Sequence, residues 1–267
     1  MSGIRDSVDI PPAQMRRAWR TVTWAGLLGS SYYLLCIAGA PFIKFLTELK
    51  ATAFDFGLIA GLGAFALALQ LVGAVIGSRL TRRKPLWMVL VIAHRLLFLG
   101  VLLAPLLFVG ERLRIWWIIL FLFLHDALAQ VTVPMFLSWM ADLLPHETMT
   151  RHWASRQRFI TLANVLLMIA LAIGFHFFEV RGQVIGGFMI IAGIGIVLGV
   201  ADILMFYWVP EPSNERAPSS GFKEILAQPL RDVEYRSFLI FVGYWHLGIF
   251  IAAPFMGLYM IDQLHFS

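Results

Sequence analysis

The chain has 267 residues, of which 60% are apolar and only 14% are charged, a composition that excludes an ordinary soluble domain. The apolar residues fall in long runs without alternation of polar and apolar positions, which excludes a transmembrane β-barrel. We therefore expect an all-α polytopic membrane protein. Contact with anionic lipid headgroups explains the net charge of +5, so no nucleic-acid partner is needed to account for it.

Taken in chain order, seven runs are long enough to cross about 30 Å of hydrocarbon as helices. After a cytoplasmic segment at 1–20, the first six spans form a predicted bundle over 21–208. Residues 209–236 are predicted to be a cytoplasmic linker with a short amphipathic helix, and 237–267 contain the seventh span. The seven spans are expected at 21–43, 54–77, 86–108, 115–140, 159–178, 184–208 and 237–260.

Lysine and arginine are distributed unequally between the two sides of these spans. Fifteen lie on the side of the amino terminus and five on the other, so the positive-inside rule predicts a cytoplasmic amino terminus in a multi-pass inner-membrane protein. The larger group is Arg5, Arg16, Arg17, Arg20, Arg79, Arg82, Arg83, Lys84, Arg151, Arg156, Arg158, Arg216, Lys223, Arg231 and Arg236, and the smaller is Lys44, Lys50, Arg112, Arg114 and Arg181.

Small residues in several spans recur at helical spacing. In the first span, a stripe that runs from Gly26 to Cys36 either lets a neighbouring helix approach closely or presents Tyr33 to a cavity. Two further glycine pairs are expected to pack against neighbouring helices. The stripe comprises Gly26, Gly29, Ser30, Tyr33 and Cys36, and the pairs are Gly73/Gly77 and Gly195/Gly199.

Ionisable residues inside the third and fourth spans are the first candidates for function, because a charge in the bilayer needs compensation. Arg95 and Asp126 are expected to form an ion pair, with neutralisation of Asp126 alone more damaging than removal of both. Alternatively, His125 or Asp126 exchanges a proton or binds a solute. Gln130 lies one turn beyond Asp126.

Two ionisable residues in later spans complete the candidates. His246, near the middle of the seventh span, is either a packing residue or a ligand. Asp202 lies close enough to the end of the sixth span to be expected in contact with interfacial water, or to brace a loop. A metal site at His94, His125, Asp126 and His246 has no spacing that requires it, and we predict neither a metal nor another cofactor.

Two loops carry further sequence patterns. GSRLTRRKP at 77–85 and WMADLLPHETMTRHWASRQRF at 139–159 are followed by VPEP at 209–212, and Ala-Pro-Phe recurs at 40–42 and 253–255. Together they resemble the major facilitator superfamily, although Thr81 stands where that family's first loop usually has an acid. The matching positions are Gly77, Arg82, Arg83 and Lys84 in the first loop and Asp142, Arg151 and Arg156 in the second.

This resemblance implies secondary active transport of a small-molecule substrate, with H⁺ as the coupling ion. Two six-helix bundles would rock about a site lined by the first, fourth and seventh helices. The resemblance covers one bundle, the linker and one further helix, so we expect the second half to be missing and the chain alone not to transport. The alternative is a non-transporting membrane scaffold or a half-transporter that pairs with another chain. Common hydrolase, metalloprotease and ATP-binding motifs are absent, so no enzyme activity is predicted.

Overall fold

The computed structural model describes residues 11–143, 146–212 and 231–262, and these ranges contain helices and no strand. This confirms the all-α prediction. The predicted amphipathic helix of the linker lies outside the described residues. The helices are α1 (Pro12–Cys36), α2 (Ala40–Glu48), α3 (Ala53–Ala66), α4 (Leu69–Arg79), α5 (Lys84–Leu107), α6 (Glu111–Leu143), α7 (His146–Glu179), α8 (Val184–Met205), the short 3-10 helix η1 (Phe206–Trp208) and α10 (Val233–Asp262).

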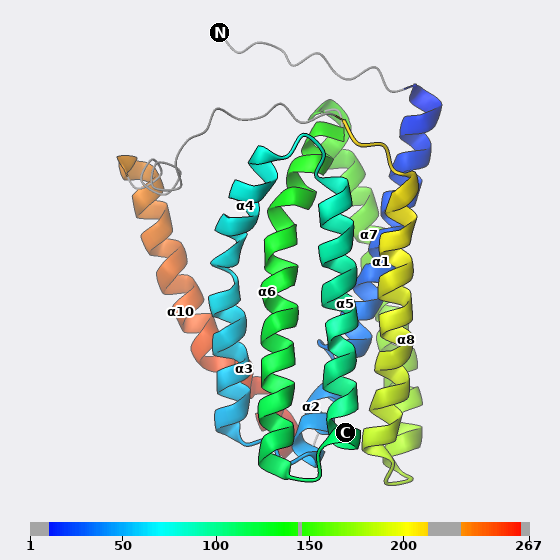
Figure 1. The fold of residues 1–267 in the computed structure, drawn as a ribbon, viewed down its shortest axis with the longest axis vertical. Helices are drawn as coiled ribbons and strands as arrows, with labels where there is room; N and C mark the ends of the chain where they lie inside the picture. Colours follow the sequence, from blue (N-terminus) through cyan, green and yellow to red (C-terminus); the bar gives the residue numbers. More distant parts are fainter. Residues whose placement is uncertain (1–10, 144–145, 213–230, 263–267) are drawn as a thin grey trace.

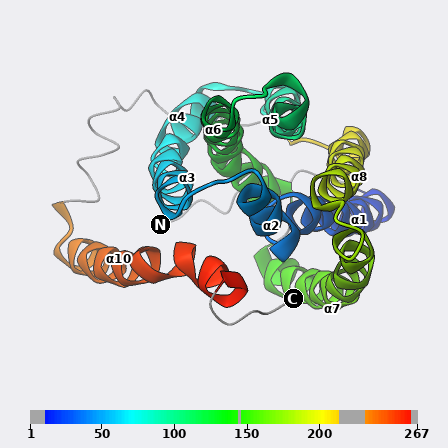
Figure 2. The same ribbon diagram turned by 90° about the horizontal axis from the view of Figure 1, so that it is seen from below.

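Six segments within the described ranges are long and apolar enough to cross a membrane, and they coincide with the first six predicted spans. They run roughly side by side in an up-and-down bundle (Figure 1). α10 covers the seventh predicted span as a helix but is not one of these six, so that span stays a prediction. It lies at the edge of the bundle beside α3 (Figures 1 and 2).

α1 begins at Pro12, several residues before the expected start of the first membrane span at residue 21. Proline is favoured in the first helical turn because its missing N–H would have no partner there. Arg16, Arg17 and Arg20 therefore lie on the helix, exposed, rather than in a separate segment at 1–20. Likewise, α7 begins at His146, before the expected start of the fifth span at residue 159, and includes basic residues expected in the preceding loop.

Two of the six spans are broken into two helices. α1 ends where the N–H groups of Ile37 and Ala38 both donate to Tyr33 O, at 2.9 and 3.0 Å, and Pro41 lies in the first turn of α2. Between α3 and α4, a short series of i to i+3 hydrogen bonds replaces the α-helical pattern around Leu67 and Ala68. Both α3 and α4 pack against α6.

The buried apolar residues form two clusters, one toward each end of the bundle. The cluster toward α2 contains the phenylalanines Phe42, Phe45, Phe98 and Phe188. The cluster toward η1 is built on Trp87, Trp139 and Phe206. Along α1, α5 and α8, the glycines and charged residues of the site lie between the positions that contribute to the two clusters. The bundle therefore has a polar layer between two apolar cores.

Candidate functional site

Two glycines of α1 make room for the charged side chains of three other helices. A Cβ atom at Gly26 would clash with the guanidinium of Arg156 from α7. One turn along, a Cβ at Gly29 would lie 2.5 Å from Asp202 Oδ2 of α8 and 3.5 Å from Arg95 Nη2 of α5. Arg95, Arg156 and Asp202 therefore lie side by side along the glycine face of α1, and we call them the central cluster.

The partner of Arg95 is Asp202, and the predicted Arg95–Asp126 ion pair is not formed. Arg95 Nη2 lies 3.2 Å from Asp202 Oδ2, with the two side chains only 13% and 6% exposed. Asp202 is therefore not in contact with interfacial water as expected, since the whole residue is 4% exposed. The cause is the packing of α5 against α8, where Gly199 leaves space for the Arg95 stem and for the Tyr32 ring.

Asp126 belongs to a second group of polar side chains, which adjoins the central cluster. His125 Nδ1 lies 2.9 Å from Asp126 Oδ1, and His125 Nε2 lies 2.7 Å from the Tyr32 hydroxyl. Because an ionised carboxylate can only accept, Nδ1 donates to Asp126, and in a neutral ring Nε2 accepts from the Tyr32 O–H. Arg95 Cζ lies 3.8 Å from the centre of the Tyr32 ring. Tyr32 thus connects the two groups.

His94 lies inside this arrangement, 4.8 Å from His125 between ring centres. It is buried, at 6% exposure, and within the described residues its Nδ1 atom has no hydrogen-bond partner. A buried polar atom without a hydrogen-bond partner costs free energy. A water molecule or a bound group that hydrogen-bonds to His94 Nδ1 would therefore be stabilised there.

The remaining candidates of the first, fourth and seventh spans lie apart from the central cluster. Gln130 accepts a hydrogen bond of 2.7 Å from Gln70 of α4, and Asp126 Oδ2 lies 3.2 Å from where a Cβ at Gly63 of α3 would be. Tyr33 is 54% exposed. His246 is exposed on α10, where Nδ1 lies 2.9 Å from Val242 O.

A cavity of about 500 Å³ borders the central cluster. It lies among α1, α5, α6, α7 and α8, in the half of the bundle toward η1. Its walls combine aromatic and aliphatic groups such as Trp87 and Phe136 with polar ones, whereas Tyr33, Asp126, Gln130 and His246 do not border it. The polar lining consists of Ser30, His94, Arg95, Thr132, Arg156, Gln157, Asn164 and Asp202.

A second cavity, of about 420 Å³, lies between α1, α2 and α7 toward the other end of the bundle. Its lining is mainly aliphatic, with an ion pair between Lys44 and Glu179 at its edge. This pair leaves neither partner's charge uncompensated, so the second cavity offers less for the recognition of a polar solute than the cavity at the central cluster.

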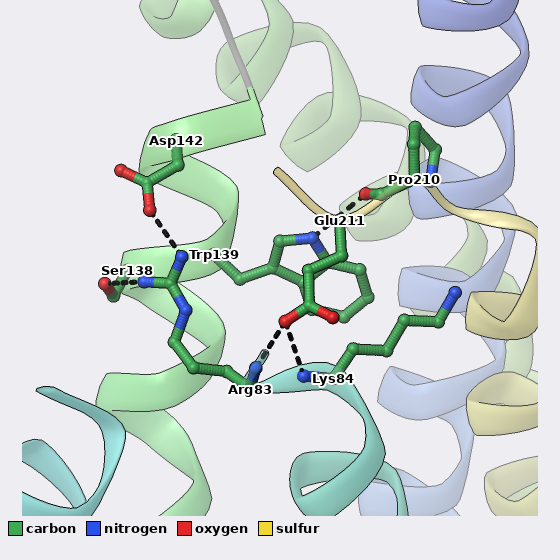
Figure 3. Close-up of polar contacts among 7 residues, drawn as sticks. All are labelled: Arg83, Lys84, Ser138, Trp139, Asp142, Pro210 and Glu211. Carbon is green, nitrogen blue, oxygen red and sulfur yellow. Dashed lines mark hydrogen bonds and ion pairs between the residues drawn. The ribbon is translucent and has the colours of Figure 1, made fainter. Parts of the chain in front are cut away.

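At the η1 end, the two loop patterns and the segment after η1 come together (Figure 3). The buried guanidinium of Arg83 forms an ion pair with Asp142 and donates to Ser138 Oγ, both on α6. Glu211 Oε1 accepts from the backbone N–H groups of Arg83 and Lys84, the latter at 2.8 Å. We call Arg83, Lys84, Ser138, Trp139, Asp142, Pro210 and Glu211 the end cluster.

The end cluster satisfies groups that would otherwise lack partners. Glu211 places a carboxylate at the amino terminus of α5, where unpaired N–H groups and the helix dipole favour a negative charge. Trp139 Nε1 donates to Pro210 O at 3.1 Å, and Lys84 Nζ donates to Tyr207 O and Val209 O at 2.7 and 2.8 Å. These contacts fasten α5, α6 and the segment after α8 to one another.

The other loop residues named from the sequence are dispersed. Gly77 lies on α4 beside Met135, with 3.2 Å between its Cβ position and Met135 Cγ. Arg82 and Arg151 are exposed. Arg156 is not in a loop at all, because it lies within α7 and its side chain points to the cavity.

Comparison with known proteins gave no further guide: no family model matches the chain, and neither the curated proteins nor the solved structures contain a match. Within the described ranges, no group of three or more His, Cys, Asp or Glu side chains is placed to hold a metal ion.

Proposed function

We propose that this six-helix bundle works in secondary active transport, moving a small solute across the membrane by alternating access as in the major facilitator superfamily. The single observation that supports this best is the position of Arg95, Arg156 and Asp202 beside a cavity within membrane-spanning helices. A charge at the bilayer centre costs about 2.5–3.5 kcal/mol on insertion scales. A bundle that served only as a scaffold would have no need of three such side chains around an open space.

Protons are the proposed coupling ion, with Asp126 as the exchange site. Its side chain is 34% exposed, whereas that of its partner His125 is 4% exposed. Protonation of Asp126 would remove the acceptor of His125 Nδ1 and change the hydrogen bond between His125 and Tyr32. Because the Tyr32 ring lies against Arg95, the proton would then alter the environment of the Arg95–Asp202 pair.

The end cluster is proposed to hold the η1 end of the bundle together in one state of the transport cycle. Its contacts hold two spans and the segment after η1 together, and alternating access requires contacts of this kind to form and break. We also propose that this end is cytoplasmic. Exposed basic residues surround it, among them Arg16, Arg82 and Arg158, as the positive-inside rule requires.

The proposal is tested by solute-dependent proton movement in liposomes that contain the protein and a trapped pH indicator. Anionic, neutral and cationic solutes are added in turn across an imposed pH gradient. If the bundle transports without the second half expected from the resemblance, one class will change the internal pH and D126N will abolish the change. E48Q, at an exposed position of α2, is the matched control and should behave as the wild type. If no class moves protons beyond the level of empty liposomes, proton-coupled transport by the chain alone is contradicted.

A further inference from the structure

The charges around the cavity do not balance. Two guanidinium groups, Arg95 and Arg156, face one carboxylate, Asp202. Asp202 is paired with Arg95 at 3.2 Å, and Arg156 is within electrostatic range of the same carboxylate without forming an ion pair with it. The charged lining therefore has a net charge of +1, carried by Arg156.

Within the described residues, the guanidinium of Arg156 has few partners. Its Nε atom donates to Val22 O at 3.3 Å, and Cζ lies 4.9 Å from the centre of the Trp153 ring. No carboxylate of these residues forms an ion pair with it. An arginine that lies in a membrane-spanning helix without a counterion is costly, and its planar fork matches a carboxylate through two parallel hydrogen bonds.

The rest of the lining limits what can accompany that negative charge. Ser30 and Asn164, whose side chains are hydrogen-bonded at 3.0 Å, add neutral hydrogen-bonding groups to the same lining. The lining also includes apolar side chains, among them Trp87, Phe136 and Ile203. A volume of about 500 Å³ accommodates a small organic molecule. An inorganic anion would leave the apolar walls without a contact, and a cation would meet a positive site.

We propose that this cavity binds a small organic monoanion, a carboxylate on an apolar body, and that Arg156 binds its carboxylate group. This inference rests on the proposed transport function for its biological meaning, but binding can be measured without transport. Benzoate, benzamide and benzylamine form a suitable set of probes, because they share a ring and carry an anionic, a neutral and a cationic group.

The test is binding of radiolabelled benzoate to the purified chain in lipid nanodiscs, with unlabelled benzamide and benzylamine as competitors. We expect benzoate to compete at least about tenfold better than either, since a charge-assisted pair is lost with both. R156Q should weaken benzoate binding about tenfold or more, and R156K less, because lysine keeps the charge without the fork. R158Q, at an exposed position two residues along α7, should bind as the wild type.

Two results would overturn the inference. One is that benzamide competes as well as benzoate, a result that needs only the wild-type protein. The other is that R156Q binds benzoate as the wild type does. The two proposals also fail separately. Benzoate binding that depends on Arg156, without any solute-driven proton movement, would support the anion site and contradict transport. Proton movement driven by a neutral or cationic solute, without benzoate binding, would support transport and contradict the anion site.

Discussion

Removal of the Asp202 carboxylate should destabilise the bundle far more than removal of the whole Arg95–Asp202 pair. Both side chains are less than 15% exposed, so D202N leaves a buried guanidinium without its partner. Breaking a buried pair from one side costs about 3–5 kcal/mol, whereas replacing both members is often nearly neutral. D202N should therefore lower the free energy of unfolding by about 3–5 kcal/mol, and R95Q/D202N by about 1–2 kcal/mol.

The two single variants should also differ from each other. R95Q leaves Asp202 close enough to Arg156 for electrostatic attraction. R95Q should therefore lower the free energy of unfolding by about 3 kcal/mol or less. D202N instead leaves both arginines without a carboxylate. The central cluster thus predicts a defined order of stability, with the double variant above R95Q and R95Q above D202N.

The assay is reversible unfolding of the purified protein in mixed micelles, followed by tryptophan fluorescence, for the wild type and the three variants. The coupling energy of the double-mutant cycle, which is the sum of the two single costs minus the cost of the double variant, should be about 3 kcal/mol or more. A parallel cycle on Arg95 and Asp126 is the control, and its coupling should be below about 1 kcal/mol because these two side chains form no ion pair. Additive effects at Arg95 and Asp202, or stronger coupling to Asp126, would refute the assignment of partners.

The same unfolding assay tests three other contacts. G73A should cost about 1–3 kcal/mol, because a Cβ there would clash with the α6 backbone at Val131. Y32F should cost about 1–3 kcal/mol, because it removes the hydrogen-bond partner of the buried His125 Nε2. D142N should cost about 2–3 kcal/mol, because Asp142 forms an ion pair with the guanidinium of Arg83 in the end cluster, and the Arg83 side chain is only 1% exposed.

Each of these variants has a neighbour that serves as its control. G61A adds a methyl group where nothing lies within 4 Å, Y33F changes an exposed ring, and R82Q changes an exposed side chain next to the end cluster. All three should stay within about 0.5 kcal/mol of the wild type. If a control is as costly as its counterpart, the contact named for that counterpart is not the cause.

The sequence predicts the number and position of the first six spans because long apolar runs have few alternatives in a membrane. The sequence also identifies Arg83 and Asp142 as candidates among the basic and acidic residues, because the two loop patterns contain them. It does not show that these two residues meet, nor that Glu211, visible only as a letter of VPEP, lies at the start of α5.

The partner of Arg95 was missed for a related reason. Sequence order makes α5 and α6 neighbours, which favoured Asp126, but α5 also packs against α8, and chain order does not indicate that contact. The loop pattern predicts that Arg156 lies outside a span, because basic residues usually end a span, whereas it lies within α7. The glycines of α1 indicate where the central cluster lies. Gly26 and Gly29 are one turn apart, and the space that they leave is filled by large side chains from other helices.

The central claim is that water and solute can enter the cavity beside the central cluster, and thiol labelling tests it most directly. In a C36A background, Asn164 on the cavity wall and Leu166, 62% exposed on a different side of α7, are each replaced by cysteine. A membrane-impermeant, negatively charged methanethiosulfonate reagent is then added to each side of the membrane. We predict that N164C is modified and L166C is not. An unreactive N164C on both sides, with normal labelling of a control cysteine at Arg82, would contradict the account.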